Sequence, residues 1–220
     1  MSGPPVRSPA VFYLHGFVSS PRSTKVQYFL QVLAEYGIEL QCPDFNEPDF
    51  RTMTMTRMLD QLEARLAAVG SPATLIGSSL GGTLAIIAAA RFGAAVDRLV
   101  LLAPAVMFGD PRHHLLTPDQ IDLWKRRGEF DFFHYGYGET RQLSYAFHED
   151  SLKYDAFGTL FAQPTLIFQG TRDSLVDSKD VERFAAARPN TALSLLDDDH
   201  QLVASLPGIW HDVAPFLGVV

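Results

Sequence analysis

The sequence of 220 residues contains a single cysteine, Cys42, so no disulfide can form within the chain. This excludes a small scaffold held together by disulfides and fits a reducing compartment. A chain of this length buries roughly 70% of its unfolded surface, enough for a core that needs no cross-link or structural metal. Hydrophobic residues make up 47% of the sequence and charged residues 20%, a balance that excludes general disorder. We therefore expect one domain spanning residues 1–220.

Positive charge is also scarce, because 18 lysines and arginines stand against 25 aspartates and glutamates. The formal net charge of −7 argues against a protein that binds nucleic acid and against one that binds anionic membranes. Residues 73–90 carry no charge, but glycines and serines at positions 77–82 interrupt them. A spanning helix needs about 20 apolar residues, so this stretch is more typical of a buried strand, a turn and a buried helix.

The first ten residues contain three prolines and no apolar run, which is unlike a secretory signal. We expect a cytoplasmic protein with no integral membrane association.

Short apolar runs alternate along the chain with longer segments in which apolar residues recur every three or four positions. The short runs predict strands at residues 10–14, 38–41, 73–76, 98–102, 165–169 and 191–196. The longer segments predict helices at residues 23–36, 54–69, 80–92, 177–187 and 206–217. Strands separated by helices of this length indicate an α/β fold, with a mostly parallel sheet of about six strands flanked by helices.

The alternation is interrupted at residues 105–162, and this stretch has a different composition. Eleven of the 25 aromatic residues of the chain fall between Trp124 and Phe161. Long excursions from a compact sheet are usually functional or disordered, and the density of aromatic residues argues against disorder. We expect a helical, aromatic-rich insertion that forms a cap over a site, within the single domain. An ordinary helical insertion with its own small core is the alternative.

One serine lies in a pattern typical of a catalytic nucleophile. Residues 77–81 read Gly-Ser-Ser-Leu-Gly between a predicted strand and a predicted helix, the context that a nucleophile elbow requires. The turn presents its central side chain at the carboxyl edge of the sheet, and the neighbours two positions away must be small. That register selects Ser79, because a central Ser78 would be flanked by the bulky Ile76 and Leu80.

A serine hydroxyl needs a base to take its proton, and in this architecture an acid and then a histidine follow the serine along the chain. Asp173 lies in the loop after the predicted strand at residues 165–169, whereas Asp177 is better placed to cap the next helix. His200 lies in the loop after the next strand, at the same edge of the sheet. We expect Ser79, Asp173 and His200 to form a catalytic triad. No metal site is expected, because the consecutive aspartates at 197–199 cannot easily converge on one ion.

An oxyanion hole requires two backbone N–H groups that face the developing negative charge. We expect one from Leu80, the residue after the nucleophile, and one from the loop after the first strand. In that loop Gly16 permits a close approach and Phe17 is the expected donor, with Val18 as the alternative. Phe17, Val18 and Trp124 are the expected substrate-binding residues. His15 is expected to brace the loop.

These segments, in this order along the chain, resemble the α/β-hydrolase superfamily: His-Gly-Phe at 15–17, Gly-Ser-Ser-Leu-Gly-Gly at 77–82, Asp173 and His200. The longer string at residues 13–25, taken with 77–82, is similar to the small bacterial YqiA-like esterases. The resemblance implies an α/β-hydrolase fold and acyl transfer through a serine ester. It also implies that neither a metal nor an organic cofactor takes part.

The sequence therefore favours an esterase or thioesterase that acts on a small-molecule substrate, with an apolar acyl or aromatic group beneath the cap. Two alternatives stay open. One is a hydrolase or lyase that breaks a carbon–carbon bond with the same triad, and the other is a non-catalytic ligand-binding protein. The first would fit an anionic substrate bound by five of the cations of the insertion: Arg112, Arg126, Arg127, Arg141 and Lys153. The second is disfavoured because a binding role needs none of the triad residues.

Overall fold

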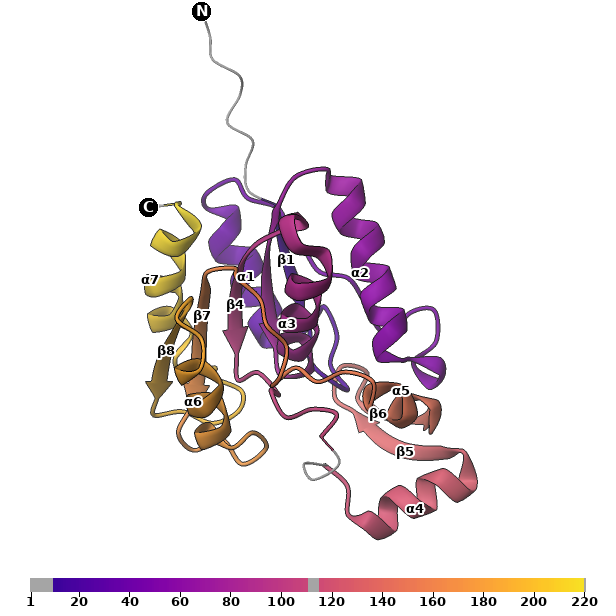
Figure 1. The fold of residues 1–220 in the computed structure, drawn as a ribbon. Helices are drawn as coiled ribbons and strands as arrows, with labels where there is room; N and C mark the ends of the chain where they lie inside the picture. The colour runs from indigo at the N-terminus through magenta and orange to yellow at the C-terminus, as the bar shows by residue number, and fades with distance from the viewer. Residues whose placement is uncertain (1–9, 111–114, 220) are drawn as a thin grey trace, which may run out of the picture.

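The computed structural model describes residues 10–110 and 115–219 and has a six-stranded sheet at its centre (Figure 1). The strands are β1 (Ala10–Leu14), β2 (Leu40–Gln41), β3 (Ala73–Ser78), β4 (Val96–Leu102), β7 (Thr165–Gly170) and β8 (Thr191–Leu196). They lie in the order β2-β1-β3-β4-β7-β8, and each is parallel to its neighbours. The carboxyl ends of all six strands therefore lie along one edge.

Helices cover both faces of this sheet. They are α1 (Thr24–Ala34), α2 (Met55–Val69), α3 (Leu80–Phe92), α6 (Ser178–Ala186) and α7 (Leu206–Leu217), with short 3-10 turns η1 (Phe50–Thr52) and η2 (Gly93–Ala95). Side chains of α1 and α7 belong to one apolar core cluster together with Val11 and Tyr13 of β1. Those of α2, α3 and α6 belong to the cluster on the other face, together with Phe12 and Leu14 of β1. Successive residues of a strand point to opposite faces, which explains why β1 is apolar at every position.

The parallel sheet and its helices match the prediction from sequence. β2 is shorter than the predicted strand and pairs with β1 only at Val11 and Phe12. β3 is longer, because Gly77 and Ser78 still pair with the end of β4. Asp177 caps α6 as expected, since its carboxylate accepts a hydrogen bond from the backbone N–H of Lys179 at 2.9 Å.

The insertion between β4 and β7 contains α4 (Pro118–Arg127), strands β5 (Glu129–His134) and β6 (Glu139–Ser144), and α5 (Ala146–Ser151). It lies beyond the carboxyl ends of the sheet strands (Figure 1). β5 and β6 form a separate antiparallel pair that the expectation of a helical insertion does not include. We call residues 129–144 the insertion hairpin.

The hairpin has a weak signature in the sequence. In β5 the partly buried Phe130 and Phe132 alternate with the exposed Asp131 and Phe133, the period of two that a half-buried strand requires. Four of the six residues of β6 are exposed, so this strand has no apolar pattern to reveal it. Pairing with β5, rather than burial, places β6.

No helix within the described ranges, 10–110 and 115–219, is both long and apolar enough to cross a membrane.

The approach of α3 to the sheet depends on glycine. A Cβ at Gly77 would collide with the carbonyl oxygen of Gly81, and a Cβ at Gly81 would collide with the carbonyl oxygen of Leu14. A Cβ at Gly82 would lie 2.8 Å from Cβ of Pro104. Each of these contacts is closer than van der Waals packing allows, so α3 can lie this close to β1 and β3 only without side chains at these positions.

We therefore expect Gly81→Ala to lower the free energy of unfolding by about 3 kcal/mol, near the upper end of overpacking costs, because the Leu14 backbone is held in the central sheet. Gly208→Ala is the matched control: Gly208 lies in α7, and a Cβ there would meet no atom within 4 Å. It should stabilise the protein by about 0.5–1 kcal/mol, since alanine is the better helix former. Urea denaturation of both variants measures the difference, and equal stabilities would contradict the packing argument.

Candidate active site

Ser79 lies at the tight turn between β3 and α3, with φ +53° and ψ −117°. A positive φ is strained for a non-glycine residue, so surrounding contacts must hold it. The backbone N–H of Ser79 donates to the carbonyl oxygen of Leu102 at 3.0 Å, and the carbonyl oxygen of Ser79 accepts from Gly82 at 2.8 Å and Ala105 at 3.2 Å. The turn is thereby fastened to the end of β4, and the side chain of Ser79 is left partly exposed.

Asp173 and His200 meet at the carboxyl ends of β7 and β8. One carboxylate oxygen of Asp173, Oδ2, lies 2.8 Å from Nδ1 of His200, and the side chain of Asp173 is fully buried. The other ring nitrogen of His200, Nε2, forms no hydrogen bond with the described residues. This arrangement holds a proton on Nδ1 and leaves Nε2 as the nitrogen available to take one.

The carboxylate of Asp173 is held by more than the imidazole. Oδ2 also accepts from the Gln169 side chain at 2.9 Å, and Oδ1 accepts from the backbone N–H groups of Leu175 at 2.8 Å and Val176 at 2.9 Å. Burial by itself raises the pKa of Asp173, but the hydrogen bonds from His200, Val176 and Leu175 outweigh it and lower the pKa below its usual value. Asp173 therefore stays ionised beside the imidazole near neutral pH.

The aspartates before His200 shape its loop. The buried Asp198 accepts hydrogen bonds from the backbone N–H and the hydroxyl of Ser205, at 2.9 and 2.8 Å, and from the backbone N–H of Asp199 at 2.8 Å. Asp199 in turn accepts from the backbone N–H of Gln201 at 2.8 Å. Among the described residues, no three His, Cys, Asp or Glu side chains are grouped so as to hold a metal ion. Through their hydrogen bonds to Gln201 and Ser205, Asp199 and Asp198 instead hold the chain on both sides of His200.

All seven residues expected in the site border one cavity of about 1330 Å³ beneath the insertion. They are Ser79, Asp173, His200, Phe17, Val18, Leu80 and Trp124. Met107, Phe108, Leu116, Ile121, Phe132 and Phe147 add apolar side chains to its lining. The loops after four different strands, together with the insertion, thus enclose a largely apolar space around Ser79 and His200.

We call residues 15–20, which follow β1, the β1 loop. A Cβ at Gly16 would lie 3.3 Å from the carbonyl oxygen of Ser78 and from Cβ of Ser79, so this loop passes directly over the nucleophile turn. The N–H groups of Phe17, Val18 and Leu80 have no backbone acceptor within the described part of the chain. Those three donors, at the loop and at the first turn of α3, are the ones expected for an oxyanion hole.

His15 braces the β1 loop, as expected from the sequence. The backbone N–H of Phe45 donates to Nε2 of His15 at 3.1 Å, which places the ring proton on Nδ1. Nδ1 then donates to the carbonyl oxygen of Gly16 at 3.0 Å. This buried ring therefore sets the orientation of the Gly16–Phe17 peptide.

Phe17 packs against the insertion, and Trp124 lies within it. The Phe17 ring stacks on Phe147 of α5, with centroids 5.4 Å apart, and meets the edge of Phe132 of β5 at 5.1 Å. Trp124 is only 4% exposed, and its Nε1 donates to the carbonyl oxygen of Leu143 at 2.9 Å. Trp124 thus supports the insertion hairpin as well as bordering the cavity.

Two residues next to the candidate triad were not identified from the sequence. Gln169, the next-to-last residue of β7, donates a hydrogen bond to Asp173. It was not identified because it lies at the end of an apolar run that was interpreted only as a strand. Lys25 is only 7% exposed, and its ammonium lies 3.5 Å from the carbonyl oxygen of His200. The sequence held one indication that Lys25 is unusual: it stands in α1 next to apolar residues that pack inward, where a charged side chain is not expected. Nothing in the sequence placed it beside a residue 175 positions away.

The cations of the insertion do not reach this cavity. Arg126, Arg127, Arg141 and Lys153 are exposed and absent from its lining, and Arg112 lies outside the described residues. Arg141 pairs with Glu139, and Lys153 pairs with Asp150.

Cys42 is half-buried and is not among the residues that line the cavity, and burial raises the pKa of its thiol to about 12.

Lys25 generates a prediction about pH. Burial lowers the pKa of Lys25 from 10.5 to about 8, although Asp173, Asp199 and Asp198 oppose the shift. Between pH 8 and 10.5 the unfolded chain keeps a proton that the folded protein has released, so raising the pH stabilises the folded state. Relative to Lys25→Met, wild-type stability should rise by up to about 1.4 kcal/mol per pH unit across this window. Urea denaturation of both proteins at several pH values measures the difference, and a difference that does not change with pH would contradict the shift.

Comparisons with known proteins agree with this architecture. The model of a family described as an uncharacterised protein family, UPF0227, matches residues 10–214. No curated protein matches the chain. Among solved structures, Est1E from Butyrivibrio proteoclasticus with bound ferulic acid has a TM-score of 0.82 at 20% identity, covering 95% of this chain and 88% of that one. Alpha/beta hydrolase domain-containing protein 10 from mouse has a TM-score of 0.79 at 18% identity, with coverages of 96% and 90%.

Monoacylglycerol lipase from Paleococcus ferrophilus has a TM-score of 0.76 at 14% identity, covering 97% of this chain and 96% of that one. At these identities the likeness establishes a shared fold. The chain therefore has the α/β-hydrolase fold, and it belongs to the UPF0227 family.

Proposed function

We propose that this protein is a serine hydrolase that cleaves a carboxylic ester or thioester of a small molecule through an acyl-enzyme on Ser79. The observation that carries the proposal is the hydrogen bond of 2.8 Å between Asp173 and His200, in the same cavity as Ser79 at its strained turn. A buried carboxylate that holds an imidazole in one tautomer serves proton transfer, and a partly exposed serine that borders the same cavity is the group that needs a base.

In the proposed reaction, Oγ of Ser79 attacks the acyl carbon while Nε2 of His200 takes the hydroxyl proton. The imidazolium is stabilised by the ionised Asp173. As the bond from the acyl carbon to oxygen or sulfur breaks, His200 returns the proton to the leaving alcohol or thiol. A water molecule then attacks the acyl-enzyme, and its proton passes through His200 to Oγ of Ser79, which releases the acid.

Negative charge on the acyl oxygen would be met by the N–H groups of Leu80 and of Phe17, with Val18 as the alternative in the loop. Their lack of backbone acceptors supports this assignment, because an N–H already bonded within the fold cannot respond to the substrate. Removing one such donor typically costs about 3–4 kcal/mol of transition-state stabilisation.

The apolar lining of the cavity supports an acyl group that is itself apolar, either aliphatic or aromatic. Est1E, whose fold this chain shares, holds bound ferulic acid, so a hydroxycinnamate ester belongs among the candidates. The alternative of carbon–carbon bond cleavage is less favoured, because Arg126, Arg127, Arg141 and Lys153, which were part of its sequence evidence, do not line the cavity.

The nucleophile is tested with a fluorophosphonate probe. Wild-type protein should be labelled at Ser79, and Ser79→Ala should abolish labelling. Ser79→Ala and His200→Ala should each lower ester turnover by about 10⁴-fold or more, and the double variant should lose little beyond either one, since the two residues act as a unit. Mass spectrometry locates the label, and steady-state kinetics measure turnover.

His211→Ala is the control, because His211 is exposed on α7 and away from the cavity lining; it should keep wild-type turnover. Labelling of Ser79→Ala, or normal turnover by His200→Ala, would overturn the proposed roles. An unlabelled wild-type protein that still binds apolar ligands would favour the non-catalytic alternative.

The position of the acyl group is tested at Ile121 of α4, a partly buried residue that borders the cavity. Ile121→Trp should lower kcat/KM for octanoyl esters and thioesters at least about 10-fold and change that for acetyl esters less than about 3-fold, because the larger ring fills space that only a long acyl group needs. Ile121→Val is the matched control and should retain both activities. An equal loss on short and long substrates would contradict acyl binding beneath the insertion.

A further inference from the structure

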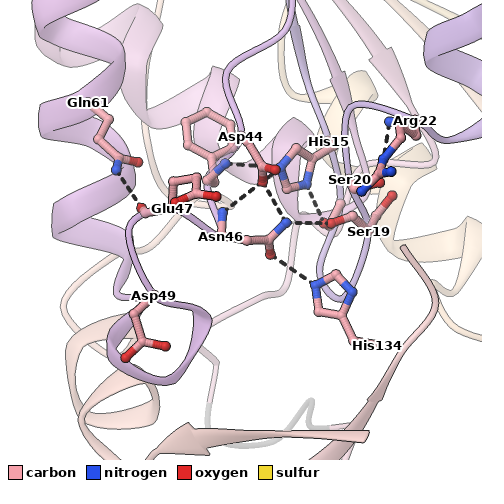
Figure 2. A network of polar contacts seen from close by, with 12 residues as sticks. His15, Ser19, Ser20, Arg22, Asp44, Asn46, Glu47, Asp49, Gln61 and His134 are labelled. Atoms are coloured by element: carbon pink, nitrogen blue, oxygen red, sulfur yellow. Dashed lines mark hydrogen bonds and ion pairs between the residues drawn. The ribbon is translucent and has the colours of Figure 1, made fainter. Parts of the chain in front are cut away.

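The insertion hairpin is joined to the β1 loop by a buried polar network (Figure 2). Three peptide carbonyls of this loop are held by hydrogen bonds, one from within the loop and two from outside it. The carbonyl oxygen of Gly16 accepts from His15 Nδ1, that of Val18 accepts from the backbone N–H of Gly136 at 3.2 Å, and that of Ser19 accepts from the Asn46 side chain at 2.9 Å. Gly136 belongs to the hairpin, and Asn46 belongs to residues 42–49, which follow β2 and are called the β2 loop.

The side-chain amide of Asn46 has all its partners within the protein. Nδ2 donates to the carbonyl oxygen of Ser19 and to Oδ1 of Asp44, at 2.9 and 2.6 Å, and Oδ1 lies 3.0 Å from Nε2 of His134. Both partners of Nδ2 are oxygens that only accept, which fixes the orientation of the amide and requires His134 to donate from Nε2. Asn46 is only 3% exposed, so water cannot replace these bonds without rearrangement.

His134 brings the insertion hairpin to this amide. It ends β5, is fully buried, stacks on Tyr137 with ring centroids 4.1 Å apart, and meets the edge of Phe50 at 4.8 Å. Burial, together with the nearby His15 and Arg141, lowers the pKa of His134 to about 4. The ring is therefore neutral near pH 7, and its single N–H is committed to Asn46.

The turn of the hairpin adds a second contact that depends on glycine. A Cβ at Gly136 would lie 2.8 Å from Cβ and 2.9 Å from Oγ of Ser20. Any other residue at this position would push the hairpin away from the β1 loop. Gly136 and His134 therefore hold the same end of the hairpin against the loop, one directly and one through Asn46.

These contacts bear on the N–H groups of the loop because a peptide unit is planar. Fixing the carbonyl of one residue fixes the N–H of the next. The peptides that carry the N–H groups of Phe17, Ser19 and Ser20 are held by His15, Gly136 and Asn46 respectively. The peptide that carries the Val18 N–H lies between held neighbours, and Val18 has a positive φ of 49°, a conformation that a β-branched residue keeps only under constraint.

We propose that Asn46 is a positioning residue: it couples the insertion hairpin, through His134, to the carbonyl of Ser19. It thereby helps to hold the conformation of the β1 loop, whose Phe17 or Val18 N–H stabilises the oxyanion. The proposal rests on the proposed function, because it assigns Asn46 a role only if the loop supplies oxyanion donors. The cap is then more than a cover for the substrate: its hairpin forms part of the support that keeps the catalytic loop in its strained conformation.

The test uses a small activated ester, such as p-nitrophenyl acetate, which has little acyl group to fill the cavity. Asn46→Ala should lower kcat by about 10- to 100-fold and change KM by less than about 3-fold, because loss of one full oxyanion donor costs about 10²- to 10³-fold in kcat and a misplaced donor costs less. The rate of labelling by a fluorophosphonate should fall in parallel. A purely structural role would instead lower the concentration of active protein and leave kcat per labelled site unchanged.

His134→Phe tests the hairpin half of the link. Phenylalanine can retain the ring contacts with Tyr137 and Phe50 and removes only the hydrogen bond to Asn46, so kcat should fall at least about 3-fold. The double variant should fall no further than Asn46→Ala, because His134 acts through that residue. If Asn46→Ala does not fold, as judged by thermal unfolding, the kcat of His134→Phe alone tests the positioning role.

Gln61→Ala is the matched control. Gln61 of α2 donates to the carbonyl oxygen of Glu47 at 2.9 Å, so it holds the same β2 loop without reaching the β1 loop. It should keep wild-type kcat. Wild-type kcat in Asn46→Ala or in His134→Phe, or an equal loss in Gln61→Ala, would overturn the positioning role. Such a result leaves the hydrolase proposal intact, whereas absence of labelling at Ser79 in the wild-type protein would overturn the hydrolase proposal first.

Discussion

The close packing of α3 against the sheet is the constraint on which the rest of the site depends. Gly77, Gly81 and Gly82 allow the helix to approach β1, β3 and Pro104 more closely than any side chain would permit. The chain must then turn sharply at Ser79, and it reaches a positive φ that only the surrounding backbone hydrogen bonds maintain. The exposure of one hydroxyl at the carboxyl edge of the sheet is thus a consequence of packing several residues away.

Around this turn, the side chains of Asp173, Asp198 and Asn46 each have hydrogen-bond partners for both of their polar atoms. Asp173 is held by His200, Gln169 and two backbone N–H groups, and Asp198 closes the loop on the far side of His200. Asn46 performs the corresponding task for the β1 loop. Because an unpaired polar group in a buried position is costly, satisfied networks of this kind define single conformations. The two loops that flank Ser79 are therefore positioned by hydrogen bonds, and the walls of the cavity by apolar contacts.

Much of the core architecture could be read from the sequence. Continuous apolar runs at β1, β3 and β4 indicated strands covered on both faces, and the register of glycines around Ser79 indicated the turn. Asp173 and His200 could be placed at the same edge because parallel strands end together. The insertion hairpin was not predicted, since β6 is mostly exposed and its position comes from pairing with β5. Lys25 and Asn46 were not assigned to the site because their partners, His200 and His134, lie far away in the chain. Gln169 was not assigned because it lies within the apolar pattern of β7.

The sequence by itself determined the alternation of strands and helices, the turn at Ser79 and the order of the candidate triad, because these depend on local periodicity and on the size of neighbouring residues. Only the tertiary structure decided which polar side chains meet, such as Lys25 with the His200 carbonyl and Asn46 with His134. It also decided which cations remain outside the cavity. Contacts of this kind are set by the packing of loops from separate strands, and no spacing along the chain encodes the distance between them.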